Sequence, residues 1–240
     1  MKTAIVTGAS SGIGLAIAQT LAKHNYAIVA NSRSISESHP AIQHINANHI
    51  AISPGDIANP TIAKQTIDIA LQRFNQIDLL VNNAGIFIPK PFTDYTPDDF
   101  HSLITTNLHG FFYISQLAAR HFTSQKAGHI VNITTSLAEN PLQTVPSSLP
   151  ILTKAGLNGV TKALALELAP SNTRVNAISP GIIDTPMHAN ADHTQLASLH
   201  PLNRLGQPQE IANALLFLEQ NQFITGEILH IDGGAHTGRW

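Results

Sequence analysis

A glycine-rich turn near the start of the chain carries the first residues with recognisable chemistry. Its sequence is Thr7-Gly8-Ala9-Ser10-Ser11-Gly12-Ile13-Gly14, after an apolar segment and directly before a helix-like one. In such a strand–turn–helix unit, backbone N–H groups and the positive end of the helix dipole face an anion, so the turn binds phosphate. Gly8 and Gly12 allow a tight turn that approaches a pyrophosphate, and Gly14 allows the helix to pack closely on the sheet. Because both flanking elements are present, we predict a dinucleotide site rather than an ordinary tight turn.

Residues that follow the next apolar segments extend this prediction. Arg33 follows segment 27–31, where a fold that prefers NAD usually places Asp or Glu. A guanidinium suits bidentate contact with a 2′-phosphate, so NADP(H) is favoured over NAD(H); the alternative is that Arg33 is a solvated loop residue. Asp56 either accepts a hydrogen bond from an adenine amino group or caps the next helix. The small residues of Asn83-Ala84-Gly85 would let a cofactor lie against the backbone.

Strand-like and helix-like segments alternate along the chain and would place these residues at one edge of a sheet. Continuously apolar segments such as 27–30 and 79–81 are typical of strands buried on both faces of a parallel sheet. Predicted strands cover 2–7, 27–31, 49–53, 78–82, 128–134, 173–179 and 227–231. Predicted helices cover 12–24, 60–74, 97–123, 150–169 and 208–219, with proline-first starts after Asn59 and Thr96, and a short helix that Pro40 disturbs near 34–48. The pattern predicts one α/β domain over 1–240, a Rossmann-like, doubly wound parallel sheet of about seven strands with helices on both faces.

Composition narrows the classes of partner. Of the 240 residues, 43% are hydrophobic and 12% are charged, which is typical of a globular chain and not of a disordered one. The net charge of −2 and the lack of a Lys/Arg run argue against nucleic acid as a partner. There is no cysteine, and the 13 histidines show no metal-ligand spacing, so we predict no metal site. No apolar run approaches the ~20 residues that span a bilayer, and a strand at residue 2 leaves no room for a signal peptide, so we expect a cytoplasmic protein without membrane contact.

Several motifs, taken in chain order, resemble those of the short-chain dehydrogenase/reductase family. They are the opening turn and the segments Asp78-x-Leu80-Val81-Asn82-Asn83-Ala84-Gly85, Ser179-Pro180-Gly181, 204–212, Ile224-Thr225-Gly226 and Ile231-Asp232-Gly233-Gly234. The resemblance covers essentially the whole chain and is to the branch that contains 3-oxoacyl-carrier-protein reductases and many sugar and alcohol dehydrogenases. It implies a nicotinamide cofactor and a homo-oligomer, a tetramer or dimer, that uses the two longest helices and the C-terminal strand.

The same resemblance implies roles for individual residues. Asn107 would hold a proton-relay water; the alternative is a buried asparagine that satisfies backbone groups. Lys154 would bind the nicotinamide ribose and lower the pKa of a neighbouring acid. The other cofactor-binding residues would be Gly8, Ser10, Ser11, Gly12, Ile13, Gly14, Arg33, Asp56, Ile57, Asn83, Ala84, Gly85, Pro180, Gly181, Ile183 and Thr185.

The chain departs from the family at the general acid, which is the tyrosine of a Tyr-x-x-x-Lys motif. Counting back from Lys154 gives Pro150, which has no titratable group. The chain's tyrosines lie far from this position in sequence: Tyr26, Tyr95 and Tyr113. A positioned acid typically contributes ~10²–10⁴-fold to such a reaction, so its replacement is a serious departure.

The other catalytic positions of the family are only partly matched. Its serine falls on either Thr135 or Ser136, and an altered loop over 137–149 would absorb the difference in spacing. The alternative proton donors are Ser147, Ser148, Thr153, Lys154 itself, a water between Lys154 and Asn107, and a histidine from 188–200.

Two hypotheses about function follow. The first is an NADP(H)-dependent oxidoreductase that acts on a small carbonyl or alcohol, uses an atypical proton donor, and covers its substrate with residues 186–203. The second is a catalytically impaired NADP(H)-binding protein that acts as a sensor or partner subunit. A third, a scaffold that has lost the cofactor as well, is disfavoured by the intact glycine turn.

Overall fold

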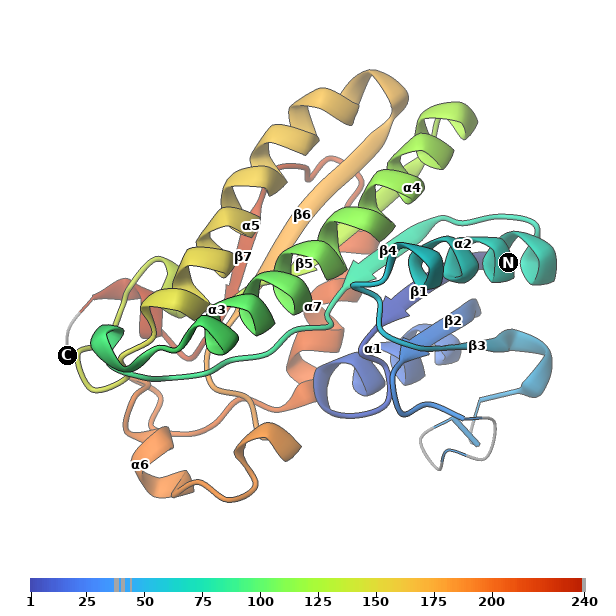
Figure 1. Cartoon of the computed structure of the whole chain (residues 1–240). Coiled ribbons are helices and arrows are strands. Elements are labelled where there is room, and N and C mark those ends of the chain that lie inside the picture. Colours follow the sequence, from blue (N-terminus) through green and yellow to red (C-terminus); the bar gives the residue numbers. More distant parts are fainter. Residues whose placement is uncertain (37–38, 40–41, 44, 239–240) are drawn as a thin grey trace.

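The computed structural model describes residues 1–36, 39, 42–43 and 45–238, which contain one seven-stranded parallel sheet (Figure 1). The sheet order is β3-β2-β1-β4-β5-β6-β7, so the winding direction reverses between β1 and β4. The strands are β1 (Lys2–Thr7), β2 (Tyr26–Ser32), β3 (Ile50–Pro54), β4 (Leu79–Asn82), β5 (Gly128–Ile133), β6 (Thr173–Pro180) and β7 (Ile228–Ile231). A crevice forms outside the carboxyl ends of the strands at such a reversal. The predicted fold class is confirmed.

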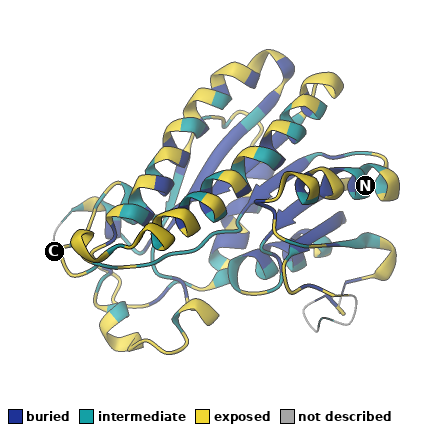
Figure 2. Cartoon of the chain, in the orientation of Figure 1, coloured by how far each residue is buried: buried dark blue, intermediate teal, exposed yellow. Residues whose placement is uncertain are grey.

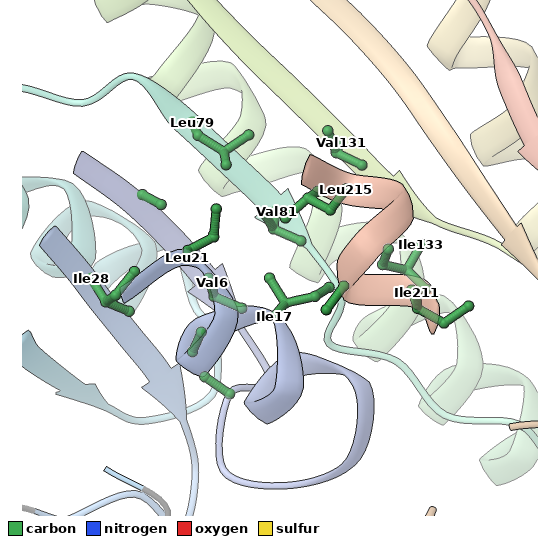
Figure 3. Close-up of a cluster of buried hydrophobic side chains, with 14 of the residues drawn as sticks. Val6, Ile17, Leu21, Ile28, Leu79, Val81, Val131, Ile133, Ile211 and Leu215 are labelled. Atoms are coloured by element: carbon green, nitrogen blue, oxygen red, sulfur yellow. The ribbon is translucent and has the colours of Figure 1, made fainter. Parts of the chain in front are cut away.

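Helices cover both faces of the sheet. They are α1 (Gly12–Lys23), α2 (Pro60–Phe74), α3 (Pro97–Leu103), α4 (Gly110–Gln125), α5 (Ser148–Leu168), α6 (His193–Ala197) and α7 (Pro208–Gln220). Because side chains alternate along a strand, Val6 packs with α1 and α7 on one face while Ile5 packs with α2, α4 and α5 on the other. Figure 3 shows the first of these clusters, where Ile17 and Leu215 meet strand residues such as Val6. Among the described helices, none is long and apolar enough to cross a membrane.

The starts of two helices follow the sequence prediction. The Asn59 side chain accepts a hydrogen bond from Thr61 N at 2.9 Å and begins α2, with Pro60 at the first helical position. Thr96 and Asp99 form a reciprocal capping box at the start of α3. In α5, Pro150 lies in the first turn, where a missing N–H removes no helical hydrogen bond. The first helical bond of α5 runs from Ile151 N to Ser147 O, so the proline leaves the helix intact.

The structure differs from the predicted elements in three segments. The single helix predicted over 97–123 is divided by a π-helical segment, η3 (Ile104–His109), between α3 and α4. The short helix α6 lies within 186–203, where no helix was predicted. The prediction that Pro40 disturbs a helix falls outside the described residues, and the described part of 34–48 holds one 3₁₀ turn, η1 (Ala47–His49).

Candidate functional site

A cavity of about 770 Å³ opens at the carboxyl ends of β1, β2, β4, β5 and β6, at the reversal of the sheet. Two predicted site residues, Gly14 and Asn107, are not among those that line it. The others all line the cavity: Gly8, Ser10, Ser11, Gly12, Ile13, Arg33, Asp56, Ile57, Asn83, Ala84, Gly85, Thr135, Ser136, Lys154, Pro180, Gly181, Ile183 and Thr185. The fold therefore brings segments far apart in the sequence into one concave site whose size suits a small-molecule ligand.

The glycine turn has the geometry of an anion site. Gly8 and Gly12 have φ of 66° and 53°, in the left-handed region that favours glycine. A Cβ on Gly14 would lie 2.3 Å from Gly8 O, so α1 packs against the turn at a distance that only glycine permits. Ser11 begins α1 without a side-chain capping bond, and the first turn of the helix holds no acidic residue. Within the described part of the chain, the N–H groups of that first turn have no side-chain acceptor, and the residues present fit a dinucleotide pyrophosphate.

A cluster of hydroxyl groups surrounds the end of β2. Ser10 Oγ lies 2.8 Å from Ser32 Oγ, and Ser34 Oγ donates to Ser10 Oγ at 3.3 Å. Arg33 lies between Ser32 and Ser34 in the chain, and all four residues line the cavity. The cluster offers hydroxyl and guanidinium donors without a carboxylate, which suits a phosphate dianion. This cluster is not predictable from the sequence, because Ser10 is 22 residues from Ser32 and the pattern Ser32-Arg33-Ser34 is its only local signal.

Asp56 is the one carboxylate among the described residues that line the cavity. Its Oδ1 accepts a hydrogen bond from Ala58 N at 3.0 Å, so Asp56 caps the turn after β3. The next helix, α2, has its own cap at Asn59, and the expectation that Asp56 caps that helix is wrong. The contact with adenine stays a prediction.

Lys154 lies on α5, where this helix passes the end of β5. The serine cluster lies at the end of β2, which β1 and β4 separate from β5 in the sheet. Its Nζ donates a hydrogen bond of 2.8 Å to Ile133 O. A Cβ built on Gly85 would lie 3.1 Å from this Nζ, so glycine leaves the ammonium room at the end of β4. Burial lowers the pKa of Lys154 to about 8, because a buried amine is less stable when charged. Ser136, buried, and Thr135, half-buried, line the same cavity, so both candidates for the family's serine position stay open.

Asn107 is buried within the π-helical segment η3, and its side chain makes three hydrogen bonds. Its Oδ1 accepts from Ile86 N at 2.9 Å, and its Nδ2 donates to Ile86 O at 3.1 Å and to Thr153 Oγ1 at 3.0 Å. These bonds tie the segment after β4 to the first turns of α5, beside Lys154. The geometry matches the alternative of a structural asparagine, and the proton-relay role stays a prediction.

None of the chain's three tyrosines, all in its described part, lines the cavity. Tyr26 donates to Glu219 Oε2 at 2.5 Å, and Tyr95 donates to Ile88 O at 2.7 Å. Tyr113 lies on α4 against His109. Pro150 is buried, four residues before Lys154 on the same helix. No phenol is therefore available at the position where the family's motif has its acid.

The segment predicted to cover the substrate lies along one side of the cavity. Its lining residues are mostly apolar: Pro186, Met187, His188, Ala191, Leu196, Leu199 and His200. His200 Nε2 accepts a hydrogen bond from Ile182 N at 2.9 Å, and a Cβ on Gly181 would lie 2.7 Å from the same nitrogen. This bond ties the segment to the end of β6. Sequence reasoning considered a histidine from 188–200 only as a proton donor and missed this anchoring contact.

The sequence of this chain is similar to those of known proteins. The family model described as enoyl-(acyl carrier protein) reductase matches residues 8–236. The 3-oxoacyl-acyl-carrier-protein reductase FabG of Buchnera aphidicola subsp. Baizongia pistaciae is 36% identical over 243 residues, covering 98% of this chain and 97% of its own. Carbonyl reductase family member 4 of Xenopus tropicalis is 34% identical over 233 residues, covering 97% of each chain.

Solved structures of other proteins have the same fold as this chain. ElxO with NADP bound superposes with a TM-score of 0.90 at 30% identity over 99% of each chain. The 3-ketoacyl-(acyl-carrier-protein) reductase from Brucella melitensis complexed with NADH gives 0.91 at 30% identity over 98% of each chain. Fold and cavity thus define a dinucleotide-binding α/β protein of the oxidoreductase class. The chain belongs to the short-chain dehydrogenase/reductase family, in the branch of 3-oxoacyl-acyl-carrier-protein reductases, whose members are NAD(P)-dependent oxidoreductases.

Proposed function

We propose that the protein is an NADP(H)-dependent oxidoreductase that acts on a small carbonyl or alcohol in the cytoplasm and uses an atypical proton donor. The observation that carries the proposal is one cavity that joins the glycine turn, the serine–arginine cluster after β2 and the buried amine of Lys154. The names of the relatives, ketoacyl and carbonyl reductases, support a carbonyl substrate. Structures similar to this chain hold NADP or NADH, which supports a nicotinamide cofactor.

Each part of the cavity would have a separate task. The first turn of α1 would hold the pyrophosphate, and Arg33 with its neighbouring serines would hold a 2′-phosphate. Lys154 would donate hydrogen bonds to the nicotinamide ribose. When bound, the cofactor supplies or accepts the hydride. The apolar side chains of segment 186–203 would exclude water from the reacting carbon.

The alternative function is an NADP(H)-binding protein without turnover, a sensor or partner subunit. One observation favours it, namely that Pro150 stands four residues before Lys154 and the tyrosines lie elsewhere. Binding of the cofactor is common to both hypotheses, so a binding measurement tests the site and a rate measurement separates the two.

Calorimetric titration is expected to show tighter binding of NADPH than of NADH. Arg33→Ala should weaken NADPH binding about 10- to 100-fold, because a hydrogen bond to a charged group contributes about 1.5–3 kcal/mol. The same variant should leave the Kd for NADH nearly unchanged, since NADH lacks the 2′-phosphate.

The matched control is Arg73→Ala, which removes one exposed arginine from the last turn of α2, away from the cavity. It should bind both cofactors as the natural chain does. Equal weakening of NADPH and NADH in Arg33→Ala would contradict the 2′-phosphate assignment, and no binding of either cofactor by the natural chain would contradict the proposed function.

The outer faces of α4 and α5 support the proposed homo-oligomer. Phe112 on α4 is 50% exposed, and Leu166 on α5 is 81% exposed. The outer surfaces of both helices are exposed in Figure 2, although both pack on the same face of the sheet. A second copy of the chain that covers these faces would bury this apolar area.

Leu166→Glu is expected to reduce the mass of the particle in solution, because it would bury a charge in the interface between two copies. Light scattering coupled to gel filtration measures that mass. Phe92→Glu, a change at a side chain 72% exposed outside these helices, is the control. A natural chain that is already monomeric would rule out the oligomer.

A further inference from the structure

The cavity holds few groups that can release a proton. Its titratable lining residues in the described part of the chain are Lys154, Arg33, Asp56, His188 and His200. Arg33 and Asp56 follow β2 and β3, at the end of the cavity assigned to the adenosine half of the cofactor. Among these titratable side chains, the remaining three are the candidate proton donors for the reacting oxygen.

Both histidines belong to segment 186–203, and the described structure shows no hydrogen bond between either ring and residues 133–136 at the end of β5. His200 Nε2 accepts from Ile182 N, so the ring carries its proton on Nδ1, which is buried and has no partner within the described structure. His188 N donates to Thr185 O, and Thr185 lies against Gly12, with its Cγ2 3.2 Å from a Cβ built there. The backbone of residues 185–188 therefore passes beside the glycine turn, which is assigned to the pyrophosphate.

Lys154 is placed differently. Its Nζ reaches the end of β5, where Ile133 O accepts one of its three N–H groups, and the described structure shows no second acceptor. Residues 134–136, which include Thr135 and Ser136, follow directly and line the same cavity. Two N–H groups are thus left for ligands, enough for one bond to a cofactor hydroxyl and one to a carbonyl oxygen.

The residue four positions earlier explains why this amine has access to substrate. Side chains at positions i and i+4 lie on the same face of a helix, so a tyrosine at position 150 would share a face with Lys154. Pro150 is smaller than tyrosine and has no proton to give. Position 150 therefore supplies no proton donor beside Lys154.

We propose that Nζ of Lys154 is itself the proton donor in carbonyl reduction by this chain, an inference that rests on the proposed function. The carbonyl carbon gains a hydride from the reduced nicotinamide, which is oxidised, and the C=O π pair takes a proton from Nζ. The products are an alcohol and a neutral lysine amine, which regains its proton from water. In the reverse direction the neutral amine removes the hydroxyl proton as the alcohol is oxidised.

The electrostatics of the site support this role. Burial lowers the pKa of Lys154 to about 8, from an ordinary value of 10.5. At pH 7 the group is still mostly protonated, and it is a stronger acid than an exposed lysine. A donor whose pKa lies near the working pH transfers a proton most effectively.

The test combines rates with direct titration of the lysine. With NADPH and a panel of aldehydes and ketones, kcat of the natural chain should be level near pH 7. It should fall about tenfold per pH unit above pH 8, as the ammonium is lost. Lys154→Arg keeps the charge but cannot release a proton in this range, so kcat should drop ~10²–10⁴-fold without that descending limb. Lys162→Arg, an exposed lysine on the same helix, should behave as the natural chain does.

A second readout does not depend on turnover. Carbon-13 labelling of lysine Cε allows each lysine to be titrated by NMR, and the resonance missing from Lys154→Arg identifies Lys154. The midpoint of the Lys154 titration should coincide with the pH at which kcat begins to fall. Calorimetry should show that Lys154→Arg still binds NADPH within about tenfold of the natural chain, which separates proton donation from cofactor binding.

The outcomes are distinguishable. Two results would overturn Lys154 as the donor but leave the oxidoreductase function in place. One is a kcat of the natural chain that stays constant from pH 7 to 10. The other is a Lys154→Arg variant with the same kcat and the same fall above pH 8 as the natural chain. A titration midpoint above pH 10 would overturn it as well. A natural chain that binds no nicotinamide cofactor would overturn the proposed function itself.

Discussion

Pro150→Tyr is expected to raise the rate of carbonyl reduction about 50-fold at pH 10 and to change it by less than about tenfold at pH 7. At pH 10, only about one in a hundred Lys154 side chains with a pKa near 8 still carries the donor proton. A phenol of pKa ~10 is about half protonated at that pH, where Lys154 is neutral and no longer lowers the pKa of a neighbouring acid. At pH 7 both acids are protonated, so the advantage of the phenol disappears. The measurement is kcat with NADPH and an aldehyde across this pH range.

Pro150→Phe is the matched control, because it adds the ring and the backbone N–H without the hydroxyl. It should show no gain at pH 10. Since Pro150 lies in the first turn of α5, neither variant removes a helical hydrogen bond. Activity that appears in Pro150→Tyr at every pH, from a natural chain with none, would instead support the NADP(H)-binding protein without turnover and contradict Lys154 as donor.

The fold was predictable because its signals are local. Continuously apolar strands, helix starts such as Asn59-Pro60 and the Gly8–Gly14 turn are each fixed by neighbouring residues, and the structure has them within two residues of the predicted bounds. The division of the helix over 97–123 was not predictable in this way. The π-helical segment holds Asn107, whose bonds to Ile86 and Thr153 join residues 21 and 46 positions away.

The sequence predicted those site residues whose role is visible within one short segment of the chain. It did not predict the contacts that form between segments far apart in the sequence. The serine cluster joins the turn after β1 to the end of β2, and His200 anchors its segment to Ile182. Each contact depends on how distant elements pack, which hydrophobic periodicity does not specify. The same limit applies to a buried ionic cluster at the amino end of the sheet, far from the cavity.

That cluster is centred on Glu219, in the last turn of α7. Its Oε1 lies 2.5 Å from His129 Nδ1 and its Oε2 accepts from Tyr26 at 2.5 Å. Arg174 lies 3.4 Å from Oε1, and Lys2 lies 3.3 Å from Oε2. The carboxylate thereby links residues of β1, β2, β5 and β6 to α7.

The protonation of His129 follows from its other partner. Asn176 Oδ1 accepts from Glu227 N at 3.0 Å, which fixes its amide so that Nδ2 donates to His129 Nε2 at 2.9 Å. The ring must then carry its proton on Nδ1 and donate it to Glu219. Burial lowers the pKa of His129, consistent with a neutral ring. Glu219 is therefore the charge that balances Arg174 and Lys2.

Glu219→Ala is expected to lower the free energy of unfolding by about 3–5 kcal/mol at pH 7, because it leaves the donors of His129 and Tyr26 without their acceptor and Arg174 without its carboxylate partner. Urea unfolding at a fixed protein concentration measures the loss. Glu227→Ala, which removes an exposed glutamate just before β7, should change stability by less than about 0.5 kcal/mol. Similar stability in both variants would contradict the role given to the cluster.

The pH dependence provides an independent check of the same cluster. Burial acts to raise the pKa of Glu219, but the hydrogen bonds from His129 and Tyr26 and the charge of Lys2 outweigh it and hold the pKa well below its usual range. A carboxyl whose pKa is lowered by folding stabilises the protein above its unfolded pKa, near 4.5, and loses that contribution as the pH falls through the lowered value. The stability difference between the natural chain and Glu219→Ala should therefore narrow as the pH falls below 4.5, because only the natural chain has this group to protonate.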